Sequence, residues 1–220
     1  MTKGSAEFLK PLLKILGFND ITISESIPNN VINLSSFRML RLNLTSGNLK
    51  THYYELYKEY LPKDFSRNYF HFMERNLYPE LNDKILLIHT SRYNNAFIDL
   101  KQLKKYQEKL LFIGLESEYE AFQKEFFELD YLPTDNDATE VAYCMLSAKG
   151  VIGNQSGLFA LAETLKVPRI LLTAEFNVIQ NRLCIGPCNV ECTGGWYEYV
   201  RTQQKLSPAI ENLINKGANI

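Results

Sequence analysis

Residues 150–172 read GVIGNQSGLFALAETLKVPRILL, and the character of this stretch changes three times. A short apolar run ends at Gly153, the polar turn 154–157 follows, and small and apolar residues then recur at helical spacing. Pro168 ends the helical pattern, and Arg169-Ile-Leu-Leu172 is typical of a strand. The stretch therefore predicts a strand, a turn, a helix and a second strand, which together form one βαβ unit.

The same alternation extends to both sides of this unit. In chain order we expect a strand over 84–89, a helix over 96–108, a strand over 110–114, a helix over 116–128, a helix opened by a capping box at 137–140, and a closing helix over 208–215. The candidate core residues of the helices are Phe97, Leu100, Leu103, Tyr119, Phe122, Phe126, Phe127, Val141, Met145 and Leu146. Strands that alternate with helices form parallel sheets, so we predict an α/β fold with a doubly wound, mostly parallel sheet over residues 81–220.

Residues 1–80 have a different texture. A helix is expected over 6–16, strands over 20–24 and 30–34, and a second helix over 49–60. Two strands and two helices bury too little apolar surface to form a core of their own. We expect a smaller, incomplete α/β region over 1–80 that packs on residues 81–220 or is the remainder of a larger domain.

The composition fits a globular chain of one full domain, or of a domain with a small partner. The 220 residues are 45% hydrophobic and 22% charged, and 24 Lys+Arg against 25 Asp+Glu give a net charge of −1. This balance argues against broad nucleic-acid binding, which depends on excess positive charge. The chain has no apolar run long enough to cross a membrane and no signal-peptide pattern, and its four cysteines fit a reducing compartment. We therefore expect a cytoplasmic protein.

The turn between Gly153 and the following helix is the first candidate site. Backbone amides at a helix start have no partner within the helix, and Gly157 would let a phosphate come close to them. The alternative is that Ser156 only caps the helix and that the glycines only make a tight turn. The local pattern does not decide between the two, since it lacks the spacing of the dinucleotide-binding and P-loop fingerprints.

The stretch Gly153-Asn154-Gln155-Ser156-Gly157, with the helix that follows and Lys166-Val167-Pro168, resembles the donor-site segment of GT-B glycosyltransferases. It is most similar to the heptosyltransferase-like family, which has Gly-Asn-Asp-Ser-Gly, a helix and Gly-Val-Pro. Upstream, 85–92 is similar to that family's strand and phosphate-side loop, and Phe112-Ile-Gly114 to its next strand. The likeness covers about residues 84–175 well, and residues 8–48 more weakly.

The resemblance implies a Rossmann-like half-domain that binds a nucleotide-diphosphate sugar, with sugar transfer by inversion and without a metal or cofactor. The implied donor-binding residues are Thr90, Ser91, Arg92, Gly114, Asn154, Gln155, Ser156, Gly157 and Glu163. Arg92 would bind the diphosphate and Glu163 the ribose hydroxyls. Without the resemblance, Arg92 is an exposed loop charge and Glu163 lies on a solvated helix face. The acceptor is not indicated.

The chain departs from the family pattern at several positions. Gln155 replaces the family's aspartate, Ala160 replaces a histidine, and Asn94 and Asn95 stand where a lysine is common. The Gly-rich loop near the family's catalytic base is not visible either, so no catalytic residue is assigned and the enzyme prediction stays open. The alternative is a non-catalytic nucleotide-sugar-binding or assembly module, completed by a partner chain or a second copy. An epimerase-like enzyme is a third interpretation, for which only His89 is placed as an acid or base.

Metal binding is not expected. Cys184, Cys188 and Cys192 are spaced more widely than in the usual zinc motifs and have no histidine near them, so reduced thiols are the preferred interpretation. Asp135-Asn-Asp137 imitates an Asp-x-Asp metal motif but precedes the capping box, which favours a role at the helix start.

Overall fold

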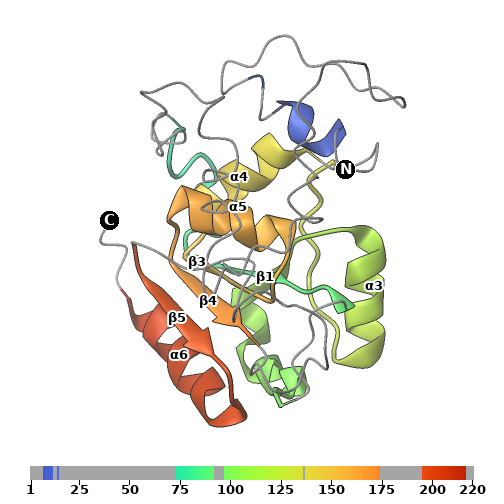
Figure 1. The fold of residues 1–220 in the computed structure, drawn as a ribbon, viewed down its shortest axis with the longest axis vertical. Coiled ribbons are helices and arrows are strands. Elements are labelled where there is room, and N and C mark those ends of the chain that lie inside the picture. Colours follow the sequence, from blue (N-terminus) through green and yellow to red (C-terminus); the bar gives the residue numbers. More distant parts are fainter. Residues whose placement is uncertain are drawn as a thin grey trace, which may run out of the picture.

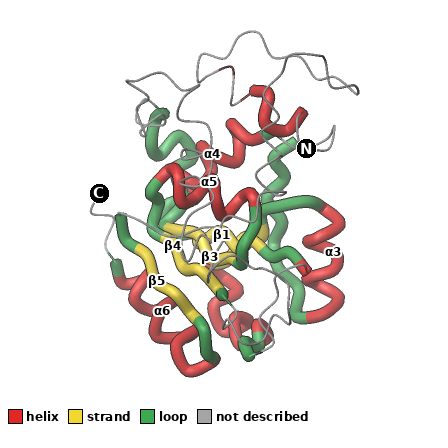
Figure 2. The backbone as a smooth tube through the Cα atoms, viewed as in Figure 1, coloured by secondary structure: helices red, strands yellow, loops and turns green. Residues whose placement is uncertain are grey.

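The chain forms an α/β structure around one parallel sheet (Figures 1 and 2). This computed structural model describes residues 7–11, 14, 73–91, 97–135, 137–173 and 195–216. The strands are β1 (Ile85–Ile88), β2 (Leu110–Phe112), β3 (Gly150–Gly153), β4 (Arg169–Leu172) and β5 (Tyr197–Val200). They form a five-stranded sheet in the order β2-β1-β3-β4-β5, and every neighbouring pair is parallel. The predicted fold class is therefore confirmed.

Helices cover both faces of the sheet (Figure 2). In chain order they are the 3₁₀ helices η3 (Pro79–Leu81) and η5 (Leu100–Lys109), and the α-helices α3 (Glu116–Glu125), α4 (Ala138–Ser147), α5 (Gly157–Leu165) and α6 (Gln203–Asn215). Leu86 and Ile88 of β1 pack with α4 and α5, whereas Ile85 and Leu87 pack with η5, α3 and α6. The strand residues alternate between the two cores, which is what a doubly wound sheet requires.

The strand order shows where the chain connections reverse their direction across the sheet. From β1 the chain continues to β2 on one side and later returns to β3 on the other side, so the connections diverge between β1 and β3. The last pair in register there is Ile88 with Gly153. A Cβ atom on Gly153 would lie 2.9 Å from the Cβ of Ile88, so only glycine permits this approach of the two strands. Open α/β sheets bind ligands at such a switch point, outside the carboxyl ends of the strands.

Two helices and one strand differ from the expectation. The helix predicted over 96–108 is the 3₁₀ helix η5, which begins only at Leu100 after Asp99 accepts a hydrogen bond from the amide of Lys101 (3.0 Å). Phe97 was predicted in the core but is 55% exposed. The closing helix was expected to begin at Pro208, but α6 begins at Gln203, and Pro208 lies inside it. Strand β5 was not predicted, because the charged Glu198 interrupts the apolar residues of Tyr197–Val200.

The predicted capping box at the start of α4 forms only in part. Asp137 accepts a hydrogen bond from the amide of Thr139 (2.7 Å), as an N-cap does. Glu140 instead accepts a hydrogen bond from the hydroxyl of Tyr78 (2.9 Å), whose own amide donates to the Oγ of Ser147 (3.0 Å). Tyr78 thereby joins the segment before β1 to both ends of α4.

The separate region predicted over 1–80 stays a prediction. Of its predicted elements, the first helix is confirmed over residues 7–11, where Phe8 and Leu9 pack against the α4–α5 core, and the other elements lie outside the described residues. Met73 and Leu81 are buried in that same core. The described part of the segment before β1 thus packs as part of the sheet domain.

Tyr78→Phe is expected to lower the free energy of unfolding by about 1 kcal/mol at neutral pH, because a hydrogen bond to a carboxylate is lost. That bond, together with burial, raises the pKa of Tyr78 to about 12. A phenol with a raised folded pKa stabilises the fold below its unfolded pKa of about 10, and this contribution is lost as the pH rises towards about 12. Urea unfolding of both proteins across this range should show their difference shrinking. A difference that stays constant would contradict the assignment.

Cys144 is expected to resist thiol reagents while the protein is folded. The side chain is 2% exposed, and burial, with the nearby carboxylates of Glu140 and Glu80, raises its pKa to about 12. A thiol reacts as its thiolate, so reaction at about pH 8 requires unfolding. The test is disulfide-exchange labelling of the variant in which Cys184, Cys188 and Cys192 are serine, with and without urea. Rapid labelling without urea would contradict a buried, protonated thiol.

Candidate functional site

Two loops meet at the switch point of the sheet. One follows β1 and contains His89, Thr90 and Ser91, and the other follows β3 and contains residues 154–157. The side chain of Asn154 joins them, since its Oδ1 accepts from the amide of Thr90 (3.0 Å) and its Nδ2 donates to the carbonyl oxygen of Thr90 (2.5 Å). Asn154 and Thr90 are both buried, so the bridge is shielded from water.

The second loop ends at the amino terminus of α5. Ser156 is the N-cap, and its Oγ accepts a hydrogen bond from the amide of Phe159 (3.1 Å). The first bond of the helix runs from the amide of Ala160 to the carbonyl of Ser156 (3.0 Å). The amides of Gly157 and Leu158 precede it, so they point out of the helix start, where its dipole favours a negative charge.

Gly157 leaves open space beside these amides. A Cβ atom built on it would have no heavy atom of the described residues within 4 Å, its chain neighbours and the nearby backbone of α5 apart, and the residue is exposed. Its φ is not in the left-handed region, so the backbone does not require glycine there. Glycine at a helical position costs up to about 1 kcal/mol relative to alanine, and neither the turn nor the packing explains that cost here. Among the described residues, the lack of a side chain at Gly157 leaves these amides uncovered.

The remaining predicted site residues of the described chain also lie after the ends of β1, β2 or β3, except Glu163. Gly114 follows β2 with a φ of +153°, which favours glycine, and its carbonyl accepts a hydrogen bond from the hydroxyl of Tyr131 (3.0 Å). Gln155 is 8% exposed, whereas Ser91 is exposed. Thr90, Ser91, Gly114, Asn154, Gln155, Ser156 and Gly157 thus share one edge of the sheet.

His89 is a packed side chain rather than an exposed acid or base. It is 6% exposed, and its ring contacts the edges or faces of Phe122 (5.7 Å between centroids) and Phe126 (5.4 Å). Both phenylalanines come from α3 or directly follow it. The His89 ring therefore packs α3 against the end of β1.

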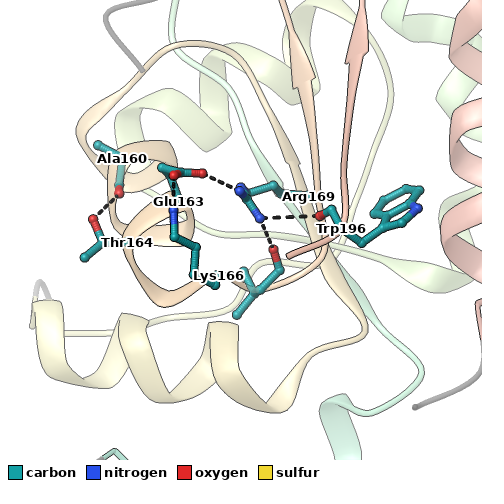
Figure 3. A network of polar contacts seen from close by, with 7 residues as sticks. Ala160, Glu163, Thr164, Lys166, Arg169 and Trp196 are labelled. Atoms are coloured by element: carbon teal, nitrogen blue, oxygen red, sulfur yellow. Dashed lines mark hydrogen bonds and ion pairs between the residues drawn. The ribbon is translucent and has the colours of Figure 1, made fainter. Parts of the chain in front are cut away.

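Glu163 lies near the other end of α5, in a buried network of charges (Figure 3). Its carboxylate forms ion pairs with Lys166 and Arg169. Glu163 is 4% exposed and Arg169 is fully buried, at the first position of β4. The interpretation of a solvated helix face is therefore wrong. Glu163 shares the inward face of the helix with Phe159 and Ala162.

Arg169 was predicted only as a strand residue, but it connects three segments. Its Nη1 donates to the carbonyl of Val167 (2.9 Å) and to that of Trp196 (3.4 Å), and its amide also donates to Trp196 (3.2 Å). The guanidinium lies 5.4 Å from the ring centroid of Tyr197. These contacts join α5, β4 and β5 (Figure 3). They lie at the amino end of the strands, whereas Ser156 follows the carboxyl end of β3.

The ribose contact predicted for Glu163 stays a prediction. Glu163 is seven residues beyond Ser156, which corresponds to about 10 Å along a helix. To bind a ribose, its carboxylate would also have to break the ion pair with Arg169. The described contacts thus give Glu163 a role in stability.

Several predicted features lie outside the described residues. These are Arg92, Asn94, Asn95, Cys184, Cys188 and Cys192. Within the described ranges, no group of three or more His, Cys, Asp or Glu side chains is arranged to hold a metal ion. A search of the same ranges finds no helix with the length and apolarity that a membrane span needs.

A comparison with solved structures shows a likeness to a glycosyltransferase. No family model matches the chain, and no curated protein matches it. Among solved structures, the E. coli heptosyltransferase WaaC with ADP is similar, with a TM-score of 0.48 and 16% sequence identity. The match covers 74% of this chain and 56% of that one, so this chain corresponds to little more than half the length of that enzyme.

Proposed function

We propose that the edge of the sheet between β1 and β3 binds the diphosphate of a nucleotide-sugar, and that the chain is the donor-binding part of a GT-B-like glycosyltransferase. The observation that carries the proposal is the open space at Gly157, beside helix amides at the switch point of a parallel sheet. The resemblance of 153–168 to the donor segment of the heptosyltransferase-like family supports the same ligand.

The proposed chemistry is a direct displacement without a metal. The acceptor hydroxyl oxygen attacks the anomeric carbon, the bond from this carbon to the diphosphate oxygen breaks, and the configuration inverts. The negative charge that develops on the leaving diphosphate would be stabilised by the amides of Gly157 and Leu158 and by the dipole of α5. Arg92 would add a charge-assisted hydrogen bond. The base that takes the acceptor proton is not assigned.

The test is a calorimetric titration of the full chain with ADP, UDP and GDP in the presence of EDTA. We expect saturable binding of at least one diphosphate, and no comparable binding of the matching nucleoside. Ser156→Ala should weaken binding because the cap no longer holds the helix start, at a stability cost of about 1 kcal/mol. Binding that requires a divalent cation, or equal binding of the nucleoside, would contradict a diphosphate site of this kind.

A non-catalytic nucleotide-sugar-binding module is the second candidate. Gln155 favours it, since a neutral and nearly buried amide stands where the resembled family has a carboxylate. Such a module would bind donors as proposed above, alone or with a partner chain or a second copy that completes it. Donor binding without hydrolysis or transfer over a broad panel of acceptors would distinguish it from the enzyme.

A further inference from the structure

We infer that Asn154 is a positioning residue, which sets the distance between the β1 loop and the start of α5. This inference rests on the proposed function, since these two parts border the proposed diphosphate site. Asn154 was predicted as a direct ligand, but both polar atoms of its side chain bind the backbone of Thr90.

The geometry extends the sheet beyond its last backbone pair. The register of β1 and β3 ends at Ile88 and Gly153, one residue before Asn154. The side-chain amide of Asn154 then donates to and accepts from one residue of the β1 loop, an exchange that an opposite residue makes through its backbone N–H and C=O in an antiparallel pair. Thr90 is 3% exposed and Asn154 is 2% exposed, so water does not replace these bonds easily.

The two bonds connect the loop after β1 with the loop that leads into α5. The residue after Asn154 and Gln155 is Ser156, the cap of α5, and the residue after Thr90 is the exposed Ser91. Because the side chain of Asn154 joins the two loops, we expect their separation to change when its amide is removed. An alanine would leave the strands paired up to Gly153 and would free the β1 loop beyond Ile88.

The test combines amide exchange with ligand affinity in the full chain. In Asn154→Ala, the Thr90 amide should exchange at least about tenfold faster, whereas the amides within β1 and β3 keep their protection. The affinity for ADP should fall by roughly tenfold or more, because the two sides of the site are no longer held in place. Asn154→Leu, which keeps the volume of the side chain but forms neither bond, should behave alike and covers the case in which the alanine variant does not fold.

Ile210→Val is the matched control, since it destabilises the core under α6 and lies on the face of the sheet opposite α5. It should lower the melting temperature without changing the affinity for ADP or the exchange of Thr90. Faster Thr90 exchange with unchanged ADP affinity in both Asn154 variants would overturn the positioning role alone. A lack of ADP, UDP and GDP binding by the unsubstituted chain would overturn the proposed function and the positioning role with it.

Discussion

Glu163→Gln is expected to lower the free energy of unfolding by about 3–5 kcal/mol, because it leaves the buried charge of Arg169 without its counter-ion. Arg169 is fully buried, whereas the Lys166 side chain is 38% exposed and can turn into water. The cost should therefore come almost entirely from Arg169. Urea unfolding of the variant and of the unsubstituted protein measures it.

Lys166→Gly is the matched control for the same network. Lys166 ends α5 with a φ of 57°, a conformation that glycine adopts without strain. Removing a partly exposed ion pair costs about 0–1 kcal/mol, so this variant should be close to neutral or slightly stabilised. Comparable destabilisation by Glu163→Gln and Lys166→Gly would show that Arg169 is not the source of the effect.

The double variant Glu163→Leu with Arg169→Met should be more stable than Glu163→Leu alone. It removes both buried charges together, so the Val167 carbonyl loses the guanidinium donor, whereas the Trp196 carbonyl keeps the backbone amide of residue 169 as a donor. A coupling of about 2 kcal/mol between the two positions is expected from a double-mutant cycle. Additive effects would contradict a direct pair.

Gly157→Asp is expected to weaken ADP binding by roughly 100-fold or more, since a carboxylate would stand beside the proposed diphosphate and repel it. The same change should not destabilise the fold. In the described part of the chain, a Cβ atom at Gly157 meets no other residue within 4 Å beyond its neighbours and the nearby backbone of α5, and an acidic side chain at a helix start is favourable by about 0.3–1 kcal/mol. Loss of binding together with gain of stability separates a ligand effect from damage to the structure.

Gly157→Ala isolates the steric part of this effect. It should stabilise the protein by up to about 1 kcal/mol and weaken ADP binding less than the aspartate does. Thermal unfolding and calorimetric titration of both variants give the comparison. If both variants bind ADP as the unsubstituted chain does, the open space at Gly157 does not hold the ligand.

The sequence predicts the β3–α5–β4 unit to the residue at most of its ends. Glycine and proline mark its limits, and the serine cap and the apolar runs between them agree with one another. Strand β5 was missed because Glu198 separates its two tyrosines, so the segment has no apolar run. The segment η5 was predicted as an α-helix, but a 3₁₀ helix repeats every three residues rather than every 3.6.

The sequence indicates candidate site residues, whose ligand contacts stay a prediction, but it does not indicate the geometry that brings them together. The strand order that puts β1 beside β3 depends on packing of distant segments, and the bonds from Asn154 to Thr90 span 64 residues. The burial of Glu163 had a signal that went unused. It lies four residues after Phe159 on the inward stripe of the helix, and Arg169 opens a strand that is buried throughout.

The central proposal is tested most directly by the amide resonances of Gly157 and Leu158. We predict that ADP and inorganic pyrophosphate shift both resonances, that adenosine does not, and that the amide of Gly150, at the opposite end of β3, is unaffected. Saturable ADP binding that leaves Gly157 and Leu158 unshifted would contradict the proposed diphosphate site.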